Sequence, residues 1–472
     1  MLNANLRRAA LLTVAISLAA CSVGPDFQRP DAALPAQWQA TPQAAAAPVD
    51  SAWWQELGDE RLAELVERAA KANLDIQTAS NRLEQSRVMR SISGGEQLPG
   101  VAARGGYSRE RNSGEGLNDP SGLSGQAPFE LWSGALDASW ELDLWGRVRR
   151  TLEAADAEVA LSQAERDGVI LSISAETASD YLQLRGTQAQ LGVTRQNLEI
   201  ARQSRDLTQT RFDNGVTTNL DVANAAAQVA TIEARLPMLL AEQDRLINAL
   251  SFLLGEAPRA LQAQLSQAEP LPQPMKGVPL GIPSELAQRR PDIQRSEAAL
   301  HRATAAIGVA KADFYPRVTL GASFGYQSLS GSDFGDWGAR DWSYGPSLYL
   351  PIFQGGRLTG TLALRERQQQ AAAIDYRRTV LSAWHEVDNA LTDYTAEQQH
   401  YRALSEAVGQ NNIALSSARE RYKEGAIDFL NVLNVQRALL ETQSALVTSA
   451  TQAALDRVRL YKALGRGWPG RG

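Results

Sequence analysis

The chain has little of what most enzymes and disulfide-bonded proteins depend on. Its only cysteine is Cys21, so no disulfide can form within the chain. It has three histidines, and His385 and His400 are too far apart along the chain for the close spacing of a zinc motif. No phosphate-binding glycine loop and no nucleophile motif occurs. The sequence therefore predicts no catalytic residue, no metal site and no cofactor.

Positive charge is also in short supply. Lysines and arginines total 47 against 53 aspartates and glutamates, which gives a formal net charge of −6. Nucleic-acid binding needs a basic face, so we expect no nucleic acid among the partners. Aromatic residues are sparse at 6%, whereas apolar residues make up 44% and include many alanines. This composition suits closely packed helices.

Long apolar runs are confined to the N-terminus. After Cys21 there is no run of about 18 apolar residues, so we expect no transmembrane helix. Any segment that crosses a membrane must then belong to a β-barrel, because backbone groups in lipid need partners. Residues 1–20, in which Arg7 and Arg8 precede an apolar stretch, have the features of a secretory signal peptide.

The end of that segment predicts a lipid anchor. Residues 18–21 resemble a bacterial lipobox, in which Cys21 becomes the lipidated N-terminus. The alternative is a free thiol in an ordinary signal-peptide tail. Several acyl chains would bind a membrane firmly, and by resemblance to bacterial lipoproteins Ser22 favours sorting to the outer membrane. Five prolines in residues 22–50 then predict an extended tether.

An internal repeat determines the expected architecture. Residues 146–255 match 356–465 without a gap, and 74–101 match 291–318. The clearest correspondence is Arg211-Phe212-x-x-Gly215 with Arg421-Tyr422-x-x-Gly425. We therefore expect one structural unit to be built twice.

Each repeat has the same predicted order of elements. A first helix stops before Pro99 or Pro316, because the residue before proline avoids the α region. Two strands follow, then a long helix, a glycine turn and a shorter returning helix that ends at Gly255 or Gly465. The expected helices are 74–97, 147–213 and 218–253 in the first repeat, and 292–314, 357–423 and 428–463 in the second.

The long helices have apolar residues at seven-residue intervals, which predicts coiled-coil packing. The second series is unbroken and consists of Val380, Val387, Tyr394, Tyr401, Val408, Leu415 and Tyr422. The first consists of Ile170, Leu184, Leu191, Leu198 and Phe212 and is broken at Thr177 and Arg205. Pro237 interrupts the returning helix of the first repeat and should kink it.

Four segments of alternating apolar and polar residues are the predicted strands. They lie at about 100–108, 129–144, 317–327 and 342–352. Alternation would also fit a soluble sandwich, but the connecting loops are polar and glycine-rich, and aromatic residues cluster near them as in an interface girdle. About eight strands are needed to close a barrel, so the chain must form oligomers to span a membrane.

Several short motifs occur in order along the mature chain. They are Cys21-x-x-Gly24-Pro25-x-Phe27-x-x-Pro30, Trp140-Glu141-Leu142-Asp143-Leu144-Trp145-Gly146-Arg147, Arg290-Pro291-Asp292-Ile293, Phe314-Tyr315-Pro316 and Pro351-Ile352-Phe353-x-x-Gly356-Arg357. Each motif is modest by itself. Together, within a two-fold repeat, they resemble outer-membrane factors of the TolC/OprM type, in the NodT-type lipoprotein branch of RND efflux systems.

The resemblance implies an α+β membrane protein that forms a homotrimer. Four strands from each of three copies would give a 12-stranded transmembrane β-barrel, continuous with a long periplasmic α-helical barrel and a mixed equatorial belt. The implied function is a passive exit duct for drugs or other toxic solutes. The implied partners are outer-membrane lipid, a periplasmic adaptor and an inner-membrane pump of the RND type. The implied location is the cell outer membrane, with a lipid anchor and a periplasmic extension.

The corresponding organisation of the chain has six parts. They are the signal peptide 1–20, the tether and equatorial segment 21–57, the first repeat 58–255, the proline-rich equatorial linker 256–283, the second repeat 284–465 and the C-terminal tail 466–472.

The resemblance also gives a role to the two hairpin turns, at 214–217 and 424–427. The residues expected to dock the adaptor are Asn214, Gly215, Val216, Glu424, Gly425 and Ala426. The two glycines have a second explanation, because a chain reversal at a helix end needs positive φ. Both explanations can hold.

A periplasmic gate is implied beside these turns. Tyr422 matches the family's gate tyrosine, whereas Asn431 and Asn434 stand where TolC has acidic rings, and Ile427 stands where it has a basic residue. We therefore predict a gate that depends on asparagine hydrogen bonds and on packing by Tyr422, without a TolC-like salt bridge. The predicted set is Tyr422, Asn431, Asn434, Asp221, Asn224 and Asp428.

Two of these acids have a second interpretation as helix caps. Thr218-Asn219-Leu220-Asp221 resembles a capping box. Asp428 stands at the matching position of the second repeat, and aspartate is a favoured N-cap residue.

Three other classes of function share some of these features. A periplasmic coiled-coil adaptor or scaffold lipoprotein would share the lipid and the seven-residue pattern but would lack the strand pairs. An outer-membrane duct for type I protein secretion would differ in its partners. An enzyme that uses Asp137, Glu141 and Asp143 is conceivable, but carboxylates that face a wet lumen are the simpler explanation. The sequence does not identify the exported substrate.

Overall fold

The computed structural model describes residues 22–30, 52–113, 115, 127–272 and 289–465. The chain divides into two compact units. The predicted lipidation site, the C-terminal tail and parts of the predicted tether and linker lie outside the described residues. Among the described residues, no helix is both long enough and apolar enough to cross a membrane.

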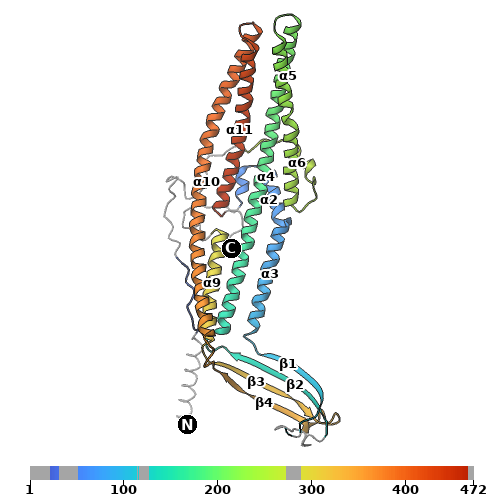
Figure 1. The fold of residues 1–472 in the computed structure, drawn as a ribbon, viewed down its shortest axis with the longest axis vertical. Helices are drawn as coiled ribbons and strands as arrows, with labels where there is room; N and C mark the ends of the chain where they lie inside the picture. The colour runs from blue at the N-terminus through green and yellow to red at the C-terminus, as the bar shows by residue number, and fades with distance from the viewer. Residues whose placement is uncertain (1–21, 31–51, 114, 116–126, 273–288, 466–472) are drawn as a thin grey trace. The chain divides into compact units, whose positions relative to one another are not determined.

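The first unit is built around one antiparallel sheet. It takes in residues up to 30, 83–162 and 296–376. Its strands are β1 (Gly100–Glu110), β2 (Phe129–Leu142), β3 (Arg317–Ser328) and β4 (Arg340–Tyr349) (Figure 1). The strands lie in chain order, so β1 and β4 form the two edges of a four-stranded sheet.

The sheet has one apolar face and one polar face. Residues that lie opposite one another on neighbouring strands share a face. Successive apolar rows are Val101, Ala138, Ala322 and Tyr344, then Ala103, Leu136, Phe324 and Trp342. On the other face Asp137 lies opposite Ser323 and forms a 2.5 Å ion pair with Arg104. The alternation predicted from the sequence is confirmed.

Two strands end earlier than predicted. β2 stops at Leu142, because the N–H of Leu144 turns back to the Leu142 carbonyl at 2.8 Å. β4 stops at Tyr349, which is paired with the first residue of β3, Arg317. β3 cannot begin earlier in the ladder, since proline precedes Arg317 and has no N–H to donate. The prediction that the strands include Leu144, Leu350 and Ile352 is wrong.

The second unit contains the two helical hairpins. It takes in residues 31–82, 163–295 and 377 onward. The long helices α4 (Arg147–Asp213) and α10 (Arg357–Lys423) have the predicted bounds, and both also extend into the first unit. The returning helix of the second hairpin is unbroken as α11 (Phe429–Ala463).

The returning helix of the first hairpin is broken, as Pro237 predicted. It consists of α5 (Asn219–Glu233) and α6 (Arg235–Leu253), separated at Ala234. Proline has no N–H for the carbonyl four residues earlier, and its ring clashes with that carbonyl, so the break lies one turn before Pro237. The matching position in α11 is Val447, and α11 continues through it.

Shorter elements complete the chain. They are η1 (Trp53–Leu57), α2 (Glu60–Ala72), α3 (Leu74–Gly95), α7 (Gln262–Leu265), α9 (Pro291–Ala312) and η3 (Trp337–Ala339). The predicted helices 74–97 and 292–314 correspond to α3 and α9, each ending two residues early. Trp53 of η1 is fully buried and stacks on Tyr461 with ring centroids 5.1 Å apart, so it fixes this N-terminal segment on the helices.

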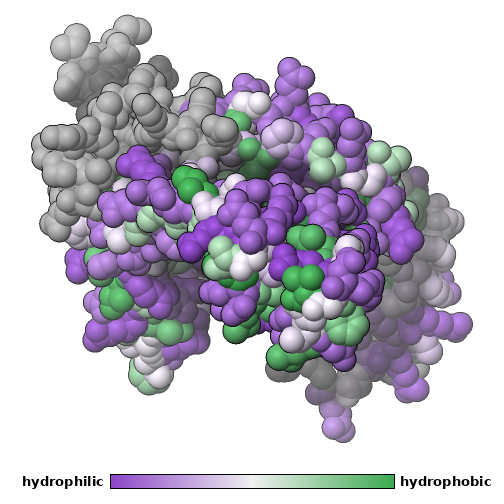
Figure 2. All heavy atoms as spheres, turned by 90° about the horizontal axis from the view of Figure 1, so that it is seen from above, coloured by the Kyte–Doolittle hydropathy of each residue, from purple (hydrophilic) through white to green (hydrophobic). Residues whose placement is uncertain are grey.

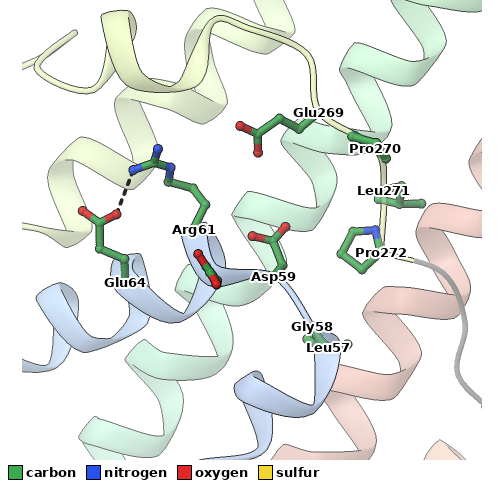
Figure 3. Close-up of a pocket in the computed structure, with 10 residues that line it drawn as sticks. Leu57, Gly58, Asp59, Arg61, Glu64, Glu269, Pro270, Leu271 and Pro272 are labelled. Carbon is green, nitrogen blue, oxygen red and sulfur yellow. Dashed lines mark hydrogen bonds and ion pairs between the residues drawn. The ribbon is translucent and has the colours of Figure 1, made fainter.

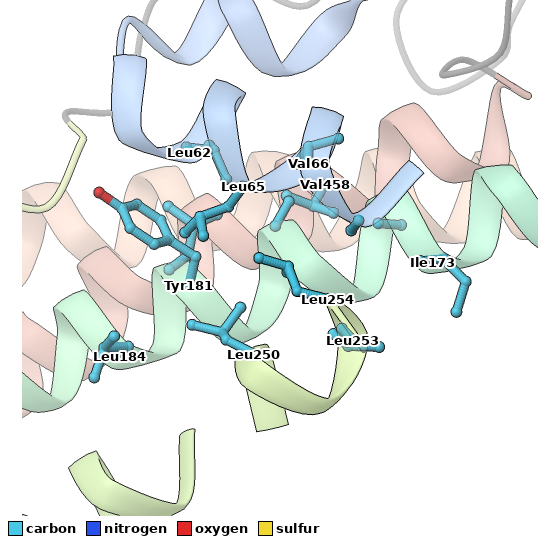
Figure 4. Close-up of a cluster of buried hydrophobic side chains, with 14 of the residues drawn as sticks. Leu62, Leu65, Val66, Ile173, Tyr181, Leu184, Leu250, Leu253, Leu254 and Val458 are labelled. Carbon is cyan, nitrogen blue, oxygen red and sulfur yellow. The ribbon is translucent and has the colours of Figure 1, made fainter. Parts of the chain in front are cut away.

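The main core of the second unit joins α2, α4, α6 and α11. It contains Leu62, Leu65 and Val66 of α2, Tyr181 and Leu184 of α4, Leu250 and Leu253 of α6, and Val458 of α11 (Figure 4). The seven-residue series contributes further buried residues, among them Leu191, Leu198, Val380, Val387, Tyr394 and Tyr422. Phe212 is the exception in the first series, since 39% of it is exposed.

Candidate gate at the helical tips

The two hairpin turns have the same backbone geometry. We call residues 211–224 the first tip and residues 421–434 the second tip. Gly215 has φ +75° and Gly425 has φ +73°, a conformation that favours glycine. In each turn an N–H returns to the carbonyl of the tip arginine at 2.8 Å, from Val216 in one and from Ala426 in the other. These bonds are those of a Schellman motif, which ends a helix by reversing the chain.

The helices that leave the tips begin differently. At the first tip the capping box is confirmed: the Thr218 hydroxyl accepts from the Asp221 N–H at 3.3 Å, and Asp221 accepts from the Thr218 N–H at 3.4 Å. Thr217 also donates to Asp221 at 2.5 Å. Partial burial by itself would raise the pKa of the Asp221 carboxyl, but the hydrogen bonds from Thr217 and Thr218 lower it below its usual value.

Asp428 differs from its predicted role in one respect. It stands at the N-cap position of α11 with an extended backbone, as expected, but its side chain accepts no capping hydrogen bond. The N–H of Asn431 is bound instead by the Asp428 backbone carbonyl at 3.1 Å. The prediction that its carboxylate caps the helix is therefore wrong.

One contact joins the two tips. The Arg211 guanidinium lies over the Tyr422 ring, 4.7 Å from its centroid, and donates to the Tyr422 carbonyl at 2.9 Å. Tyr422 is 4% exposed and packs with Phe429, Val432 and Leu433 in a small apolar cluster. The positive guanidinium thus meets both an aromatic face and the negative end of the α10 dipole. We call this pair the cross-tip contact.

The other predicted tip residues lie largely on the surface. Asn431, Asn434 and Asp428 are exposed, whereas Asn224 and Asp221 are partly buried. The predicted adaptor-docking residues Asn214, Gly215, Val216, Glu424, Gly425 and Ala426 are all exposed. Figure 2 shows a mainly hydrophilic surface in the view from above, with scattered hydrophobic side chains. The exposed residues of both turns are therefore accessible to another molecule.

Two buried arginines link segments of the second unit that are far apart in the sequence. The sequence analysis did not identify either of them. Arg185 of α4 is fully buried and donates to Glu269 at 2.6 Å and to the Gln267 carbonyl at 2.9 Å. Arg457 of α11 donates to the Tyr461 hydroxyl, which donates to Glu56 at 2.6 Å. Burial, with this hydrogen bond, raises the pKa of Tyr461 to about 12. Each arginine ties a long helix to a non-helical segment or a short 3₁₀ helix.

A pocket of about 700 Å³ lies beside the Arg185 contacts. Asp59, Glu60, Arg61, Glu64 and Glu269 line it with Pro270 and Pro272 (Figure 3). Arg61 is bound to Glu64 at 2.8 Å, and Asp59 accepts from the Tyr181 hydroxyl at 2.8 Å. These pairings account for much of the polar lining. Within the described part of the chain, no group of three histidine, cysteine, aspartate or glutamate residues could hold a metal ion.

Asp180 gives the second unit a pH-dependent stability. Burial, followed by repulsion from Glu176 one turn earlier on α4, raises the pKa of Asp180 to about 6. A raised pKa favours the folded state while the carboxyl is protonated, and this advantage is lost as the pH rises through about 6. We expect Asp180→Asn to raise the melting temperature at pH 7.5 and to leave it unchanged near pH 4. Because Asp180 is partly exposed, we expect a gain of only about 1 kcal/mol.

Thermal unfolding of the purified protein at both pH values checks this prediction. Glu176→Gln is the matched control, since it removes the repelling charge and leaves the burial, and it should give a smaller gain. Equal gains for Asp180→Asn at the two pH values would contradict a raised pKa.

Known proteins resemble this chain over nearly its whole length. Residues 65–256 and 282–466 match the family described as "Outer membrane efflux protein". Outer membrane protein OprJ of Pseudomonas aeruginosa is 33% identical over 465 residues, which cover 97% of this chain and 95% of OprJ. Nodulation protein T of Rhizobium leguminosarum bv. viciae is 30% identical over 464 residues, covering 98% and 94% of the two chains. The structure of the outer-membrane channel OprN has a TM-score of 0.89 and 34% identity, covering 95% of this chain and 100% of OprN.

Proposed function

This chain belongs to the outer membrane efflux protein family, and from that premise we propose that it is the exit duct of a tripartite efflux pump. In this role it receives drugs or other toxic solutes from a periplasmic adaptor and an inner-membrane transporter of the RND type. It conducts them passively to the outside. The family consists of duct proteins rather than enzymes, and the duct needs no cofactor.

The observation that carries the proposal is a sheet that is incomplete in a single chain. β1 and β4 each have one strand partner among the described residues, so both edges can pair with another copy. The apolar face is also uncovered, with Leu136 57%, Trp342 59% and Tyr344 78% exposed. An exposed apolar face with a polar face behind it suits a wall between lipid and water. Three copies of this four-stranded sheet would close a 12-stranded barrel.

The helices of the first unit support the same homotrimer. Val88, Met89 and Ile92 of α3 are 59%, 61% and 63% exposed. Ala305, which matches Val88 in the second repeat, is fully buried in α9. The matching residues of α9 are covered, Ala305 fully and Ala306 and Val309 in part, whereas the α3 stripe is bare, as expected if a neighbouring copy covers it.

The segment that follows Cys21 supports a lipid anchor. Val23 donates its N–H to the Trp145 carbonyl at 3.0 Å, just after β2. Asp26 pairs with buried Arg150 at 2.6 Å. These contacts hold residues 22–30 against the helices at the end of the sheet. Ser22, which follows the predicted lipidation site, lies against Gly146 just after β2, close to the strands that the proposed barrel places in the membrane.

The tips supply a gate of a different kind from one made by acidic rings. Tyr422 and Arg211 provide the packing, and the exposed Asn431 and Asn434 line the entrance with uncharged amides. Asp221 is engaged in the capping box, which favours its structural role. The adaptor docks on the exposed turns around Gly215 and Gly425.

The charge of the entrance can be changed at two positions. We expect the double variant Asn431→Asp, Asn434→Asp to make the channel sensitive to block by trivalent cations, because carboxylates from several copies would converge there. The parent protein should be blocked at least about ten-fold less tightly, since one ion–carboxylate contact of about 1.4 kcal/mol accounts for that factor. Planar-bilayer recordings with hexamminecobalt measure this. Asn412→Asp, on the exposed side of α10 away from the turn, is the control. Equal block in all three proteins would remove Asn431 and Asn434 from the constriction.

Complementation tests the transport role itself. A bacterial strain without its own outer-membrane factors receives this chain together with an adaptor and an RND pump. The proposal predicts lower accumulation of a pumped dye or antibiotic, and adaptor that co-purifies with the chain. Unchanged accumulation with each adaptor and pump pair encoded beside the gene would contradict it.

A further inference from the structure

The two tips differ in a way that the repeat makes informative. In the second tip Tyr422 is covered by Arg211 of the first tip. The residue at the matching position of the first tip is Phe212, which is 39% exposed and has no cation over its ring from the described part of the chain. The arginine at the matching position of the second tip is Arg421, which is exposed and whose guanidinium has no hydrogen bond or ion pair among the described residues. The chain thus holds one complete arginine–aromatic contact and the two separated halves of a second.

The first turn, whose aromatic ring has no arginine over it, has the same backbone geometry as the second turn. Both turns have the same Schellman bonds and nearly the same glycine φ. A side chain added at Gly425 would have the Arg211 guanidinium as its nearest neighbour, with Nη2 at 3.9 Å. A side chain added at Gly215 would meet nothing within 4 Å. The space that an arginine fills beside the second turn is therefore open beside the first.

The two halves do not meet within the described part of the chain. The hairpins contact each other through α4 and α11, where Ser204 is bound by Gln436 at 2.5 Å and Asn197 donates to Gln443 at 2.7 Å. Arg211 reaches the second hairpin on that shared side. Figure 1 shows α11 and α4 between α10 and α5, so the sides of α10 and α5 that face away from this shared side are the ones the repeat makes equivalent to it.

We propose that Arg421 of one copy covers Phe212 of a second copy, and donates to the last backbone carbonyls of its α4. The partner is a second copy of this chain because only a repeat-related surface presents the same turn, ring and carbonyls. Such a contact is head-to-tail, and a head-to-tail contact closes into a ring when the rotation allows it. The inference rests on the proposed assembly of copies around a duct.

Charge favours this contact over its counterpart within the chain. The residue after Phe212 is the exposed acid Asp213, whereas the residue after Tyr422 is Lys423. Arg421 would therefore approach a carboxylate where Arg211 approaches an ammonium. Contacts within copies and between copies would alternate around the tips and hold them closed.

Cysteine cross-linking tests the geometry. In the full-length protein, Phe212→Cys with Arg421→Cys is treated with a short bis-maleimide, and we expect the monomer band to shift to covalent dimers and trimers. Either single variant should give no shift. The matched control is Arg211→Cys with Tyr422→Cys, which should link within one chain and leave the monomer mass unchanged.

The outcomes separate this inference from the proposed function. If the double variant links no better than the single variants while its native size remains that of an oligomer, the contact between copies is wrong and the duct stands. If the native protein is a monomer, the proposed function fails and this inference fails with it.

A double-mutant comparison tests the energetics. We expect Arg421→Ala and Phe212→Ala each to raise the open-to-closed ratio in planar bilayers about five-fold, which at 1.4 kcal/mol per ten-fold corresponds to about 1 kcal/mol for a single contact. The double variant should open no further than the larger single effect, since the two residues form one contact. Arg402→Ala is the control, because Arg402 is an exposed basic residue of α10 far from the turn. If the two single effects multiply in the double variant, or if no variant changes the open-to-closed ratio, Arg421 and Phe212 do not form this contact.

Discussion

Replacing Arg211 with alanine should raise the ratio of open to closed channel about ten-fold relative to the parent protein. The Arg211 guanidinium lies 4.7 Å from the Tyr422 ring centroid, donates to the Tyr422 carbonyl at 2.9 Å and reaches the Lys423 carbonyl at 3.4 Å, so it links the first turn to the second. Its loss would uncover the buried Tyr422 ring and leave the Tyr422 carbonyl at the end of α10 without this donor. A cation–π contact and one charge-assisted hydrogen bond together account for about 1.4 kcal/mol, or a factor of ten.

Single-channel recording measures this effect as open probability. Arg211→Lys should fall between the parent and the alanine variant, because lysine keeps the charge but loses the planar stacking and the fork of donors. Arg205→Ala is the matched control, since Arg205 lies on the same helix and pairs with the adjacent Asp206. If Arg211→Ala forms the parent's oligomer and opens no more often than Arg205→Ala, the cross-tip contact does not hold the gate.

The largest loss of stability should follow Arg185→Ala. Arg185 is fully buried, lies over the Tyr181 ring at 4.7 Å and binds Gln188, the Gln267 carbonyl and Glu269. Alanine would leave a cavity in α4 and release the segment that carries Glu269. Removing one member of a buried ion pair costs about 3–5 kcal/mol. Because Glu269 is partly exposed and can be solvated, we expect about 3 kcal/mol.

Thermal unfolding and the yield of assembled protein measure this loss. Arg185→Met should recover part of it, because methionine fills most of the volume without the charge. Arg195→Ala is the control at an exposed position of the same helix. A melting temperature for Arg185→Ala within the range of Arg195→Ala would show that the buried network does not stabilise the second unit.

The helices could be predicted closely from local signals. Glycines with positive φ end α4, α6, α10 and α11 next to the residues that the sequence indicated, because few other residues adopt that conformation. Pro237 predicted a disruption of the returning helix, and the break lies where a missing N–H and a ring clash require it. Strand ends were less predictable, because β2 and β4 end where their partner β3 begins, which depends on a residue far along the chain.

The site was only partly predictable for the same reason. Tyr422 was identified through the resemblance, and the capping box through its local spacing. Arg211 was missed as a gate residue, although the repeated arginine–aromatic pair was visible in the sequence as Arg211-Phe212 and Arg421-Tyr422. Repetition suggested equal roles, whereas the fold buries one aromatic ring and leaves the other exposed. Arg185 and Arg457 gave no local signal, because their partners come from distant segments.

Electron microscopy of the detergent-purified protein tests the central claim most directly. The account predicts a particle with three-fold symmetry, a closed barrel of strands in the detergent belt, and a central lumen bounded by helices. It also predicts that the edges β1 and β4 of neighbouring copies are paired. A monomer, or an open rod without a lumen, would contradict the duct and favour a scaffold lipoprotein.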